Sequence, residues 1–457
     1  MRSRYSVVIL LCLLISCQTT KKEEEVKENH TIRLVTLDPG HFHAALVQKT
    51  MYSNVDSVVH VYAPEGTDVQ MHLKRIEGFN TRPEDATRWN EEVYTGADYF
   101  DKMLKEKAGN VVVISGNNQK KTEYIRRSLE EGMNVLADKP MAINAAGFAD
   151  LKQAFATAGA KGLLLYDIMT ERYEITTMLQ REFSLLPEVF GTLQKGTPQE
   201  PAVTKESVHH FYKYVSGSVL TRPAWFMDVA QQGEGIVDVT THLVDLVQWE
   251  CFPEQVIDTT EINITNARRW TTGMTKSQFK AITKLDDFPD YLKKDVKDTV
   301  LQVYSNGAID YQIKGVNARV SVTWAYQAPE GAGDTHYSIM RGTKANLVIR
   351  QGAEQKFKPV LYIEPLAKKD AAYEKLLAEQ LKTIQAKFPG VELTPSANGW
   401  EVVIPEKYKE THEAHFSRVT EKFLEYLRSG ILPAWEVPNM ITKYYTTTRA
   451  LEIAKKK

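Results

Sequence analysis

Cysteine is scarce in this chain of 457 residues, which contains three. Cys12 and Cys17 both lie in a segment near the N-terminus, which leaves Cys251 alone in the rest of the chain. A single cysteine excludes an intramolecular disulfide and a cysteine-based metal cluster in that part. Because Cys251 lies between Trp249 and Phe252, we interpret it as a small buried apolar residue.

An excess of charge is also lacking, since 57 Lys and Arg residues balance 58 Asp and Glu residues, for a net charge of −1 at pH 7. A chain without net positive charge has no general attraction to nucleic acid, so we exclude nucleic-acid binding. Hydrophobic residues make up 43% and charged residues 25%, as is typical of globular proteins. The length is sufficient for two domains.

The apolar run at residues 7–14 is too short for a transmembrane helix, which needs roughly 20 apolar residues. Arg2 and Arg4 precede this run, and Leu-Ile-Ser-Cys follows it up to Cys17. This arrangement is typical of a secretory signal, and its end resembles a bacterial lipobox, in which the cysteine is lipidated. We therefore predict a lipoprotein signal peptide at residues 1–17, lipidated at Cys17. A plain cleaved signal is the alternative.

A charged stretch follows the signal, and we interpret residues 18–29 as a solvated tether. A lipid on Cys17 would hold the folded part at the membrane without a spanning segment. The predicted location is the periplasm or the outer surface, with membrane contact through the lipid anchor only.

Short apolar strands alternate with helices between residues 30 and 166. This alternation predicts a parallel sheet covered on both faces, as in a Rossmann-type dinucleotide-binding domain. The polar stretch from 63 to 96 carries no clear element. The expected strands are 31–36, 57–62, 110–114, 134–137 and 162–166, and the expected helices are 43–51, 98–107, 121–131 and 145–158.

From residue 167 the pattern changes to strands of period two, such as 299–304 and 308–313. The sequence Ser-Asn-Gly at 305–307 is typical of a hairpin turn between these two strands. The fold class that we predict is therefore an α/β Rossmann-type parallel-sheet domain at 30–166, followed by an α+β domain with a mostly antiparallel sheet. We expect this second domain, at 167–457, to bind substrate and to mediate oligomerisation.

The turn after the first strand is the place where an α/β domain binds the pyrophosphate of a dinucleotide, against a helix N-terminus. The usual code is G-x-G-x-x-G, whereas residues 38–43 retain only Gly40. Asp38 replaces the first glycine and His43 the third. Ala63 stands where an acid should hold the ribose. An ordinary turn between a strand and a helix is equally compatible with this sequence.

A lysine stands just after the strand at 134–137, in the sequence Asp138-Lys139-Pro140. Open α/β sheets bind ligands beyond the carboxyl ends of their strands, so Lys139 is positioned to contact a nicotinamide ribose and a substrate hydroxyl. Pro140 would fix the turn that follows. A surface lysine at a strand end is the alternative, and spacing alone favours neither interpretation.

A glycine-rich segment from Gly233 leads into an expected helix that carries Asp238, His242 and Asp245 at i, i+4 and i+7. This spacing places the three side chains on one helical face. An acid one turn before a histidine can orient and charge it for acid–base chemistry. The same spacing is compatible with a helical metal site or with a structural pair.

These three elements, in this order, resemble the Gfo/Idh/MocA family (glucose–fructose oxidoreductase and inositol dehydrogenase) over about residues 30–350. The family's E-K-P motif corresponds to Asp138-Lys139-Pro140, and its glycine-rich run with Asp and His corresponds to 233–242. Residues 116–118 resemble the family's cofactor loop, whereas Lys121 stands where many members have His. The long C-terminal part resembles a Bacteroidetes lipoprotein subgroup.

The resemblance implies NAD or NADP as cofactor, and hydride transfer to or from a carbon that bears a sugar or glycoside hydroxyl. It makes Lys139 and His242 the catalytic pair at that hydroxyl, with Asp238 tuning or positioning. We favour His242 as the base, because Lys139 would need a lowered pKa for that role. The residues implied in cofactor binding are Gly40, His41, Phe42, His43, Gly116, Asn117, Asn118, Asp138, Lys139 and Pro140.

Five further residues are candidates for the sugar pocket, and each has an ordinary structural alternative. They are Tyr166, Arg172, His210, Trp225 and His336. We expect no metal site, because the pair His412 and His415 lacks a third ligand nearby and is more typical of a solvated helix face. Analogy with the family suggests a homodimer or homotetramer.

Free NAD is scarce outside the cytoplasm, so an exported member is expected to hold its cofactor tightly. One activity that satisfies this requirement forms a keto-sugar and returns the hydride to a second carbonyl compound. Another is a redox-assisted glycosidase, which oxidises, eliminates a substituent and reduces again. A non-catalytic sugar-binding lipoprotein on the same scaffold is the remaining alternative. The lost glycines favour it, and the set Lys139, Asp238 and His242 opposes it.

Overall fold

The computed structural model describes residues 32–215, 218–367 and 371–457. The predicted signal peptide at 1–17, the lipidation site Cys17 and the tether at 18–29 lie outside the described residues. No helix in the described ranges is long and apolar enough to cross a membrane.

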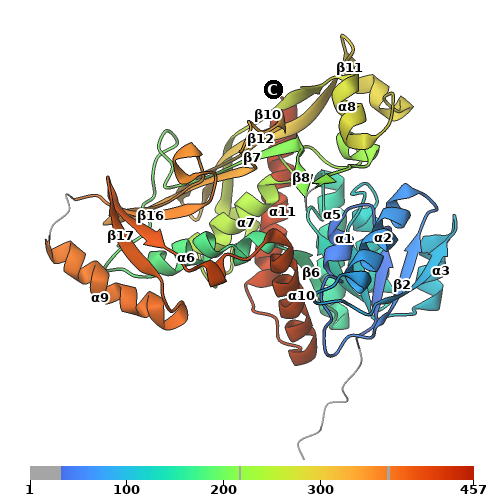
Figure 1. Cartoon of the computed structure of the whole chain (residues 1–457), viewed down its shortest axis with the longest axis horizontal. Coiled ribbons are helices and arrows are strands. Elements are labelled where there is room, and N and C mark those ends of the chain that lie inside the picture. The colour runs from blue at the N-terminus through green and yellow to red at the C-terminus, as the bar shows by residue number, and fades with distance from the viewer. Residues whose placement is uncertain (1–31, 216–217, 368–370) are drawn as a thin grey trace, which may run out of the picture. The chain divides into compact units, whose positions relative to one another are not determined.

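The first domain contains a six-stranded sheet in the order β3-β2-β1-β4-β5-β6, and every neighbouring pair is parallel (Figure 1). This is the strand order of a Rossmann fold, which confirms the predicted fold class. Residues of β1 and β4 are buried throughout, because helices cover both faces of the sheet. The strands are β1 (Leu34–Leu37), β2 (Val58–Ala63), β3 (Asn90–Thr95), β4 (Val111–Ile114), β5 (Asn134–Asp138) and β6 (Leu165–Ile168).

Two elements of this domain differ from expectation. The polar stretch after β2 contains the helix α2 (Thr67–Thr81) and the edge strand β3, whose mostly exposed residues lack an apolar pattern. Helix α1 (His43–Leu46) ends five residues before the predicted end, because the next amides bond in tighter i to i−3 turns. The other helices are α3 (Tyr99–Glu106), α4 (Lys121–Glu130) and α5 (Ala145–Lys161).

The second sheet has ten strands and is mostly antiparallel, as predicted, with one parallel pair between β7 and β13. Its order is β10-β12-β13-β7-β14-β15-β16-β18-β17, and β11 pairs with β12. The strands are β7 (Val203–Tyr212), β10 (Ile262–Met274), β11 (Val296–Lys297), β12 (Val300–Ile313), β13 (Val316–Gln327), β14 (Thr335–Arg341), β15 (Ala345–Arg350), β16 (Val360–Pro365), β17 (Glu392–Ser396) and β18 (Gly399–Val403).

The predicted hairpin turn at 305–307 is wrong, because β12 runs through it and turns into β13 only after Ile313. The pairing of β12 with β10 shifts register beside Asn306, whose amide donates to the backbone of Trp270. A Cβ on Gly307 would lie 2.5 Å from the Cβ of Ile236. The Ser-Asn-Gly sequence therefore forms an irregularity that admits a neighbouring backbone.

Helices α6 (Ile175–Ser184), α7 (Thr240–Cys251) and α11 (Glu436–Lys455) share an apolar core with this sheet. Helix α10 (His412–Ser429) and part of α11 pack instead with the core of the first domain, through residues such as Phe416, Phe423 and Tyr444. The C-terminal helices thus contact both domains (Figure 1).

A buried network of charges joins α7 and α11 to the end of β6. Arg172 forms a bidentate pair with Asp245 at 2.7 Å and contacts Glu436 at 3.1 Å. Lys443 lies between Asp245, at 2.8 Å, and Asp167, at 2.7 Å. Because each of these charges is removed from water, each depends on its partners to offset the cost of burial.

We predict that Lys443→Met lowers the free energy of unfolding by about 3–5 kcal/mol, because it takes the ammonium away from the buried carboxylate of Asp167, while Asp245 keeps Arg172. Denaturation with urea measures the change. Lys102→Met, which breaks an exposed pair with Glu106 on α3, serves as the control and should change little. Equal effects of the two substitutions would contradict a special role of the buried network.

Candidate active site

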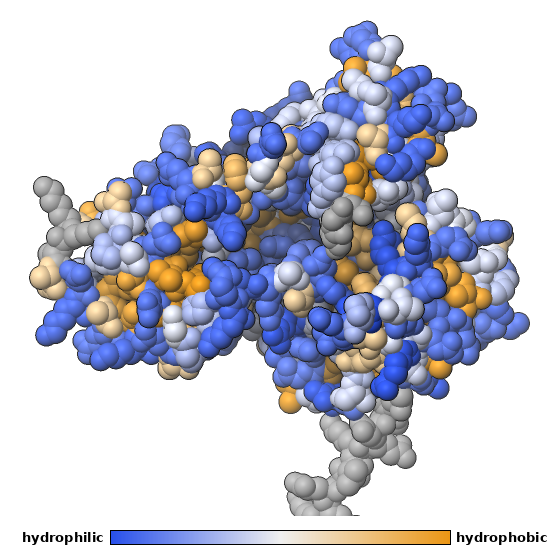
Figure 2. All heavy atoms as spheres, in the orientation of Figure 1, coloured by the Kyte–Doolittle hydropathy of each residue, from blue (hydrophilic) through white to orange (hydrophobic). Residues whose placement is uncertain are grey.

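A cavity of about 440 Å³ lies beyond the carboxyl ends of β1, β4 and β5, where the first sheet faces β7 and α7. The strand order reverses between β1 and β4, which is the point where open α/β sheets bind ligands. Figure 2 shows this face hollowed near its centre, with mostly hydrophilic residues around the hollow. The lining includes His41, Phe42, His43, Gly116, Asn118, Asp138, Lys139, Glu171, His209, Lys213, Asp238, His242, Asp334, His336 and His412.

The loop after β1 is held by a close backbone approach to the loop after β4. A Cβ on Gly116 would lie 2.2 Å from the carbonyl oxygen of Asp38 and 2.7 Å from the nitrogen of Gly40, so only glycine fits there. The Asp38 carboxylate accepts a hydrogen bond from the Tyr124 hydroxyl at 2.9 Å, and burial raises its pKa. That hydrogen bond satisfies the carboxylate that stands in place of the first glycine of the code.

A cluster of His41, His43 and Asp138 forms the wall beside this loop. One Asp138 oxygen lies 2.9 Å from His43 Nδ1 and accepts from the Ser115 hydroxyl at 3.0 Å. Burial lowers the pKa of His43 to about 4, so the imidazole is neutral at pH 7. Lys121 donates to the backbone carbonyl of Asp138 at 2.9 Å, which is how the departure from the family's histidine is accommodated.

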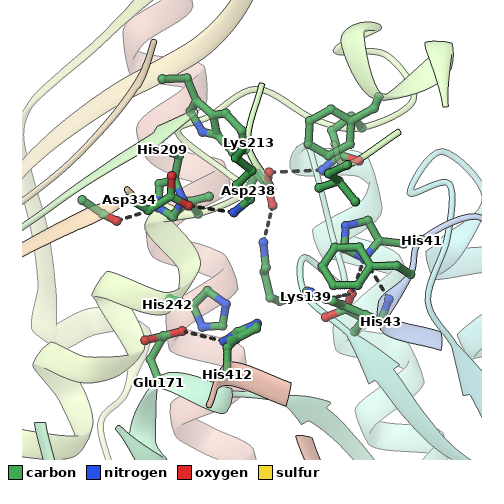
Figure 3. A pocket seen from close by; sticks show the side chains of 18 of the residues that line it. His41, His43, Lys139, Glu171, His209, Lys213, Asp238, His242, Asp334 and His412 are labelled. Atoms are coloured by element: carbon green, nitrogen blue, oxygen red, sulfur yellow. Dashed lines mark hydrogen bonds and ion pairs between the residues drawn. The ribbon is translucent and has the colours of Figure 1, made fainter. Parts of the chain in front are cut away.

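Lys139 extends from the end of β5 toward the segment before α7, where its Nζ lies 2.6 Å from Asp238 (Figure 3). Gln232 donates to the other Asp238 oxygen at 3.1 Å. Burial disfavours the ammonium, but the carboxylates of Asp238 and Asp138 outweigh it and raise the pKa of Lys139. Asp238 therefore pairs with Lys139 and tunes the lysine of the expected catalytic pair.

His242 lies in the first turns of α7 and lines the same cavity as Lys139. Its Nδ1 is buried and has no hydrogen-bond partner among the described residues. Burial and the ammonium of Lys139 lower the pKa of His242 to about 3, so its ring is neutral. The predicted three-residue helical face is not formed, because α7 begins after Asp238 and because Asp245 pairs with Arg172.

Of the five candidates for the sugar pocket, the structure places only His336 in the lining. Tyr166 and Arg172 are excluded because both bond to Glu436 in the buried charge network. His210 is buried against Asp334 at 3.0 Å, and its neighbour His209 lines the cavity instead, since successive strand residues face opposite ways.

Three predicted cofactor residues also lie outside this lining, and Gly40 is one of them, with Asp68 and Trp225 close to it. Asn117 donates to Gln231 at 2.7 Å, and Pro140 follows Lys139 without lining the cavity. Asn118 does line it, with a buried Oδ1 that has no partner among the described residues.

Several cavity residues were not predicted from the sequence. Asp334 accepts from Lys213 at 2.7 Å, and its pKa is lowered by the neighbouring His209 and Lys213, against the effect of burial. Glu171 lies 3.5 Å from His412, which lines the cavity and is not part of a purely solvated helix face (Figure 3). Polar side chains in β7 were the signal for His209, whereas nothing local marked Asp334.

The expected dinucleotide site has a nicotinamide end near Lys139 and a pyrophosphate end near Gly40, and the two ends differ in the space that they offer. Near Lys139 the cavity is open, and Asn118 offers an unpartnered amide oxygen. Over Gly40, where the pyrophosphate approaches the backbone, a Cβ would lie 3.0 Å from both Asp68 and the indole of Trp225. Trp225 donates to Asp68 at 2.8 Å. The nicotinamide end therefore has open space, whereas Trp225 and Asp68 lie close to Gly40 at the pyrophosphate end, so we expect the indole to move aside when a dinucleotide binds.

A Rossmann sheet joined to an α+β domain, with this cavity at the switch point, defines an NAD(P)-dependent oxidoreductase. Residues 39–166 match the family model described as "Oxidoreductase family, NAD-binding Rossmann fold". Residues 179–455 match the model described as "Putative oxidoreductase C terminal domain". The chain belongs to the Gfo/Idh/MocA family of oxidoreductases.

Two similar proteins agree with this assignment, and a third shares the fold. A "putative oxidoreductase" from Parabacteroides merdae is 59% identical, with 93% of this chain and 98% of that chain covered, at a TM-score of 0.92. The uncharacterized oxidoreductase YhhX of Escherichia coli is 28% identical over 165 residues, which span 36% of this chain and 43% of that protein. Levoglucosan dehydrogenase with NADH and levoglucosan shares the fold at 11% identity, a TM-score of 0.59 and coverage of 93% and 97%.

We predict that Trp225→Ala tightens the binding of NAD⁺, because no indole then has to leave the space over Gly40. In the unchanged protein the indole must first break its hydrogen bond to Asp68, which costs about 1 kcal/mol. Without this cost the affinity for NAD⁺ should rise roughly fivefold. Titration calorimetry measures the change, with Trp249→Ala on α7 as the control. Weaker binding in Trp225→Ala would mean that the indole supports the cofactor.

Proposed function

We propose that this oxidoreductase transfers a hydride between a nicotinamide and a sugar or glycoside carbon that bears a hydroxyl group. The observation that carries the proposal is that one cavity holds Lys139, Asp238 and His242 at the switch point of the sheet. The many polar side chains around them suit a substrate with several hydroxyl groups. A neighbour in fold, levoglucosan dehydrogenase, is described in complex with a sugar derivative.

The ammonium of Lys139 polarises the reacting oxygen, since its raised pKa keeps it charged beside Asp238. His242 lines the same cavity and is neutral, so its imidazole accepts the hydroxyl proton when the alcohol is oxidised. Glu171 favours the protonated ring and limits the lowering of its pKa. The bound dinucleotide supplies the hydride acceptor or donor. Reduction of a carbonyl uses the same groups in reverse.

We predict that His242→Ala lowers kcat by roughly 10²–10⁴-fold, because it removes the group that accepts the proton. The dinucleotide affinity should be kept, since the ring lies on the substrate side of Lys139. Steady-state kinetics and a cofactor titration measure the two quantities, with His60→Ala on β2 as the control. Retention of kcat within a few-fold in His242→Ala would contradict the assigned role.

The test of the proposed function begins with purified protein that is denatured and examined for released NAD(P)H or NAD(P)⁺ by mass. Tightly held cofactor is expected. A second, native portion of the protein is then incubated with glycosides and a carbonyl acceptor. The formation of keto-sugar is measured.

Release of aglycone from a chromogenic glycoside without any acceptor would instead identify a redox-assisted glycosidase. A protein that binds sugar, releases no dinucleotide on denaturation and binds none that is added would be identified as a binding lipoprotein. Neither outcome is compatible with the proposed dehydrogenase.

The proposal includes export and anchoring through a lipid on Cys17, which the basic n-region and the Leu-Ile-Ser-Cys sequence support. We predict that Cys17→Ser moves the protein from the membrane fraction to the soluble fraction, because the lipid is then absent. Cys12→Ser is the control and should stay with the membrane. Membrane association of Cys17→Ser equal to that of the unchanged protein would contradict the anchor.

A further inference from the structure

Three potential metal ligands converge on one wall of the cavity. Nδ1 of His43 lies 2.9 Å, and Nδ1 of His41 lies 3.7 Å, from the same oxygen of Asp138. The ligand atoms of all three residues lie within 4.8 Å of one another. Donors bound to zinc at about 2.0–2.1 Å in a tetrahedron lie roughly 3.3 Å apart, so the side chains have to shift for all three donors to reach that spacing.

A second observation also indicates a missing ligand. Asp138 is 3% exposed, and its Oδ1 has no hydrogen-bond partner among the described residues. A buried carboxylate oxygen without a partner is costly unless a cation or a donor satisfies it. Because the carboxylate lines the cavity, a bound ion is able to meet this requirement.

We propose that His41, His43 and Asp138 bind a divalent transition-metal ion of the zinc type. Two imidazoles and one carboxylate suit zinc, and three protein ligands leave a position open for water or for a substrate oxygen. Binding requires the tautomer of His43 with its proton on Nε2. The site goes beyond the proposed hydride transfer and does not depend on it.

The nearest ammonium groups do not occupy this position. Lys121 donates to the backbone carbonyl of Asp138, and Lys139 pairs with Asp238 at 2.6 Å. Both cations therefore have acceptors of their own. Figure 3 shows His41 and His43 together on the side of the cavity away from His242, with Lys139 between them. A metal ion there shares the cavity with the proposed catalytic pair.

The backbone of the same loop is still available to a dinucleotide. His41 and His43 would bind the metal through their rings, whereas a pyrophosphate approaches the backbone at Gly40. The two roles of residues 40–43 are therefore compatible. The sequence alone predicts no metal here, because the two histidines and Asp138 are separated along the chain by 95 residues.

Titration of zinc into purified, chelator-treated protein without dinucleotide tests the site. We expect one zinc ion per chain, and an affinity that falls at least about 100-fold in His43→Ala. Asp138→Asn, which keeps the shape of the side chain, should weaken binding in the same way. His60→Ala is the control, since His60 also pairs with a carboxylate, Glu92, but on β2 away from the cavity.

Cobalt provides a readout that requires no variant. Co²⁺ added to the unchanged protein should give visible absorption bands of a four- or five-coordinate site, and zinc should abolish them. Failure of the unchanged protein to bind zinc would overturn the proposal, as would equal affinities for zinc in His43→Ala, Asp138→Asn and His60→Ala. Because dinucleotide is absent, neither result bears on hydride transfer.

Discussion

The ion pair between Lys139 and Asp238 connects the two domains at the cavity. Lys139 follows the last residue of β5, and Asp238 lies in the glycine-rich segment that leads into α7. Both side chains are almost fully buried, so each charge depends on the other to offset the loss of hydration. The contact fixes where α7 begins relative to the Rossmann sheet, and therefore where His242 faces. The network around Arg172 and Lys443 holds the middle of the same helix through Asp245.

The parts of the fold that were predicted correctly are those whose burial is indicated by a local run of apolar residues. Strands β1 and β4 are apolar throughout, because helices cover both of their faces. Strand β3 was missed because it is an edge strand whose residues remain largely exposed. The turn predicted at Asn306 failed for a different reason, since its amide satisfies the backbone of a distant strand.

In the candidate active site, too, local sequence patterns could be predicted and contacts between distant residues could not. Lys139, Asp238 and His242 were found because their motifs fix a strand end and a glycine-rich segment. The true role of Tyr166 was not found, because its partner Glu436 is 270 residues away and no local pattern reveals such a contact. On β7 the sequence analysis named His210, whereas its neighbour His209 lines the cavity. A shift of one residue reverses the face of a strand.

The reaction that we propose for this cavity is direct hydride transfer between a nicotinamide and a sugar carbon. The protein is incubated with reduced nicotinamide cofactor that carries deuterium at C4 and with a set of keto-sugars, and the products are weighed by mass spectrometry. We expect an alcohol product that carries one deuterium on the reduced carbon. The proposal would be contradicted if the reduced sugar carried no deuterium, whichever face of C4 held the label. It would also be contradicted if no reduced sugar formed.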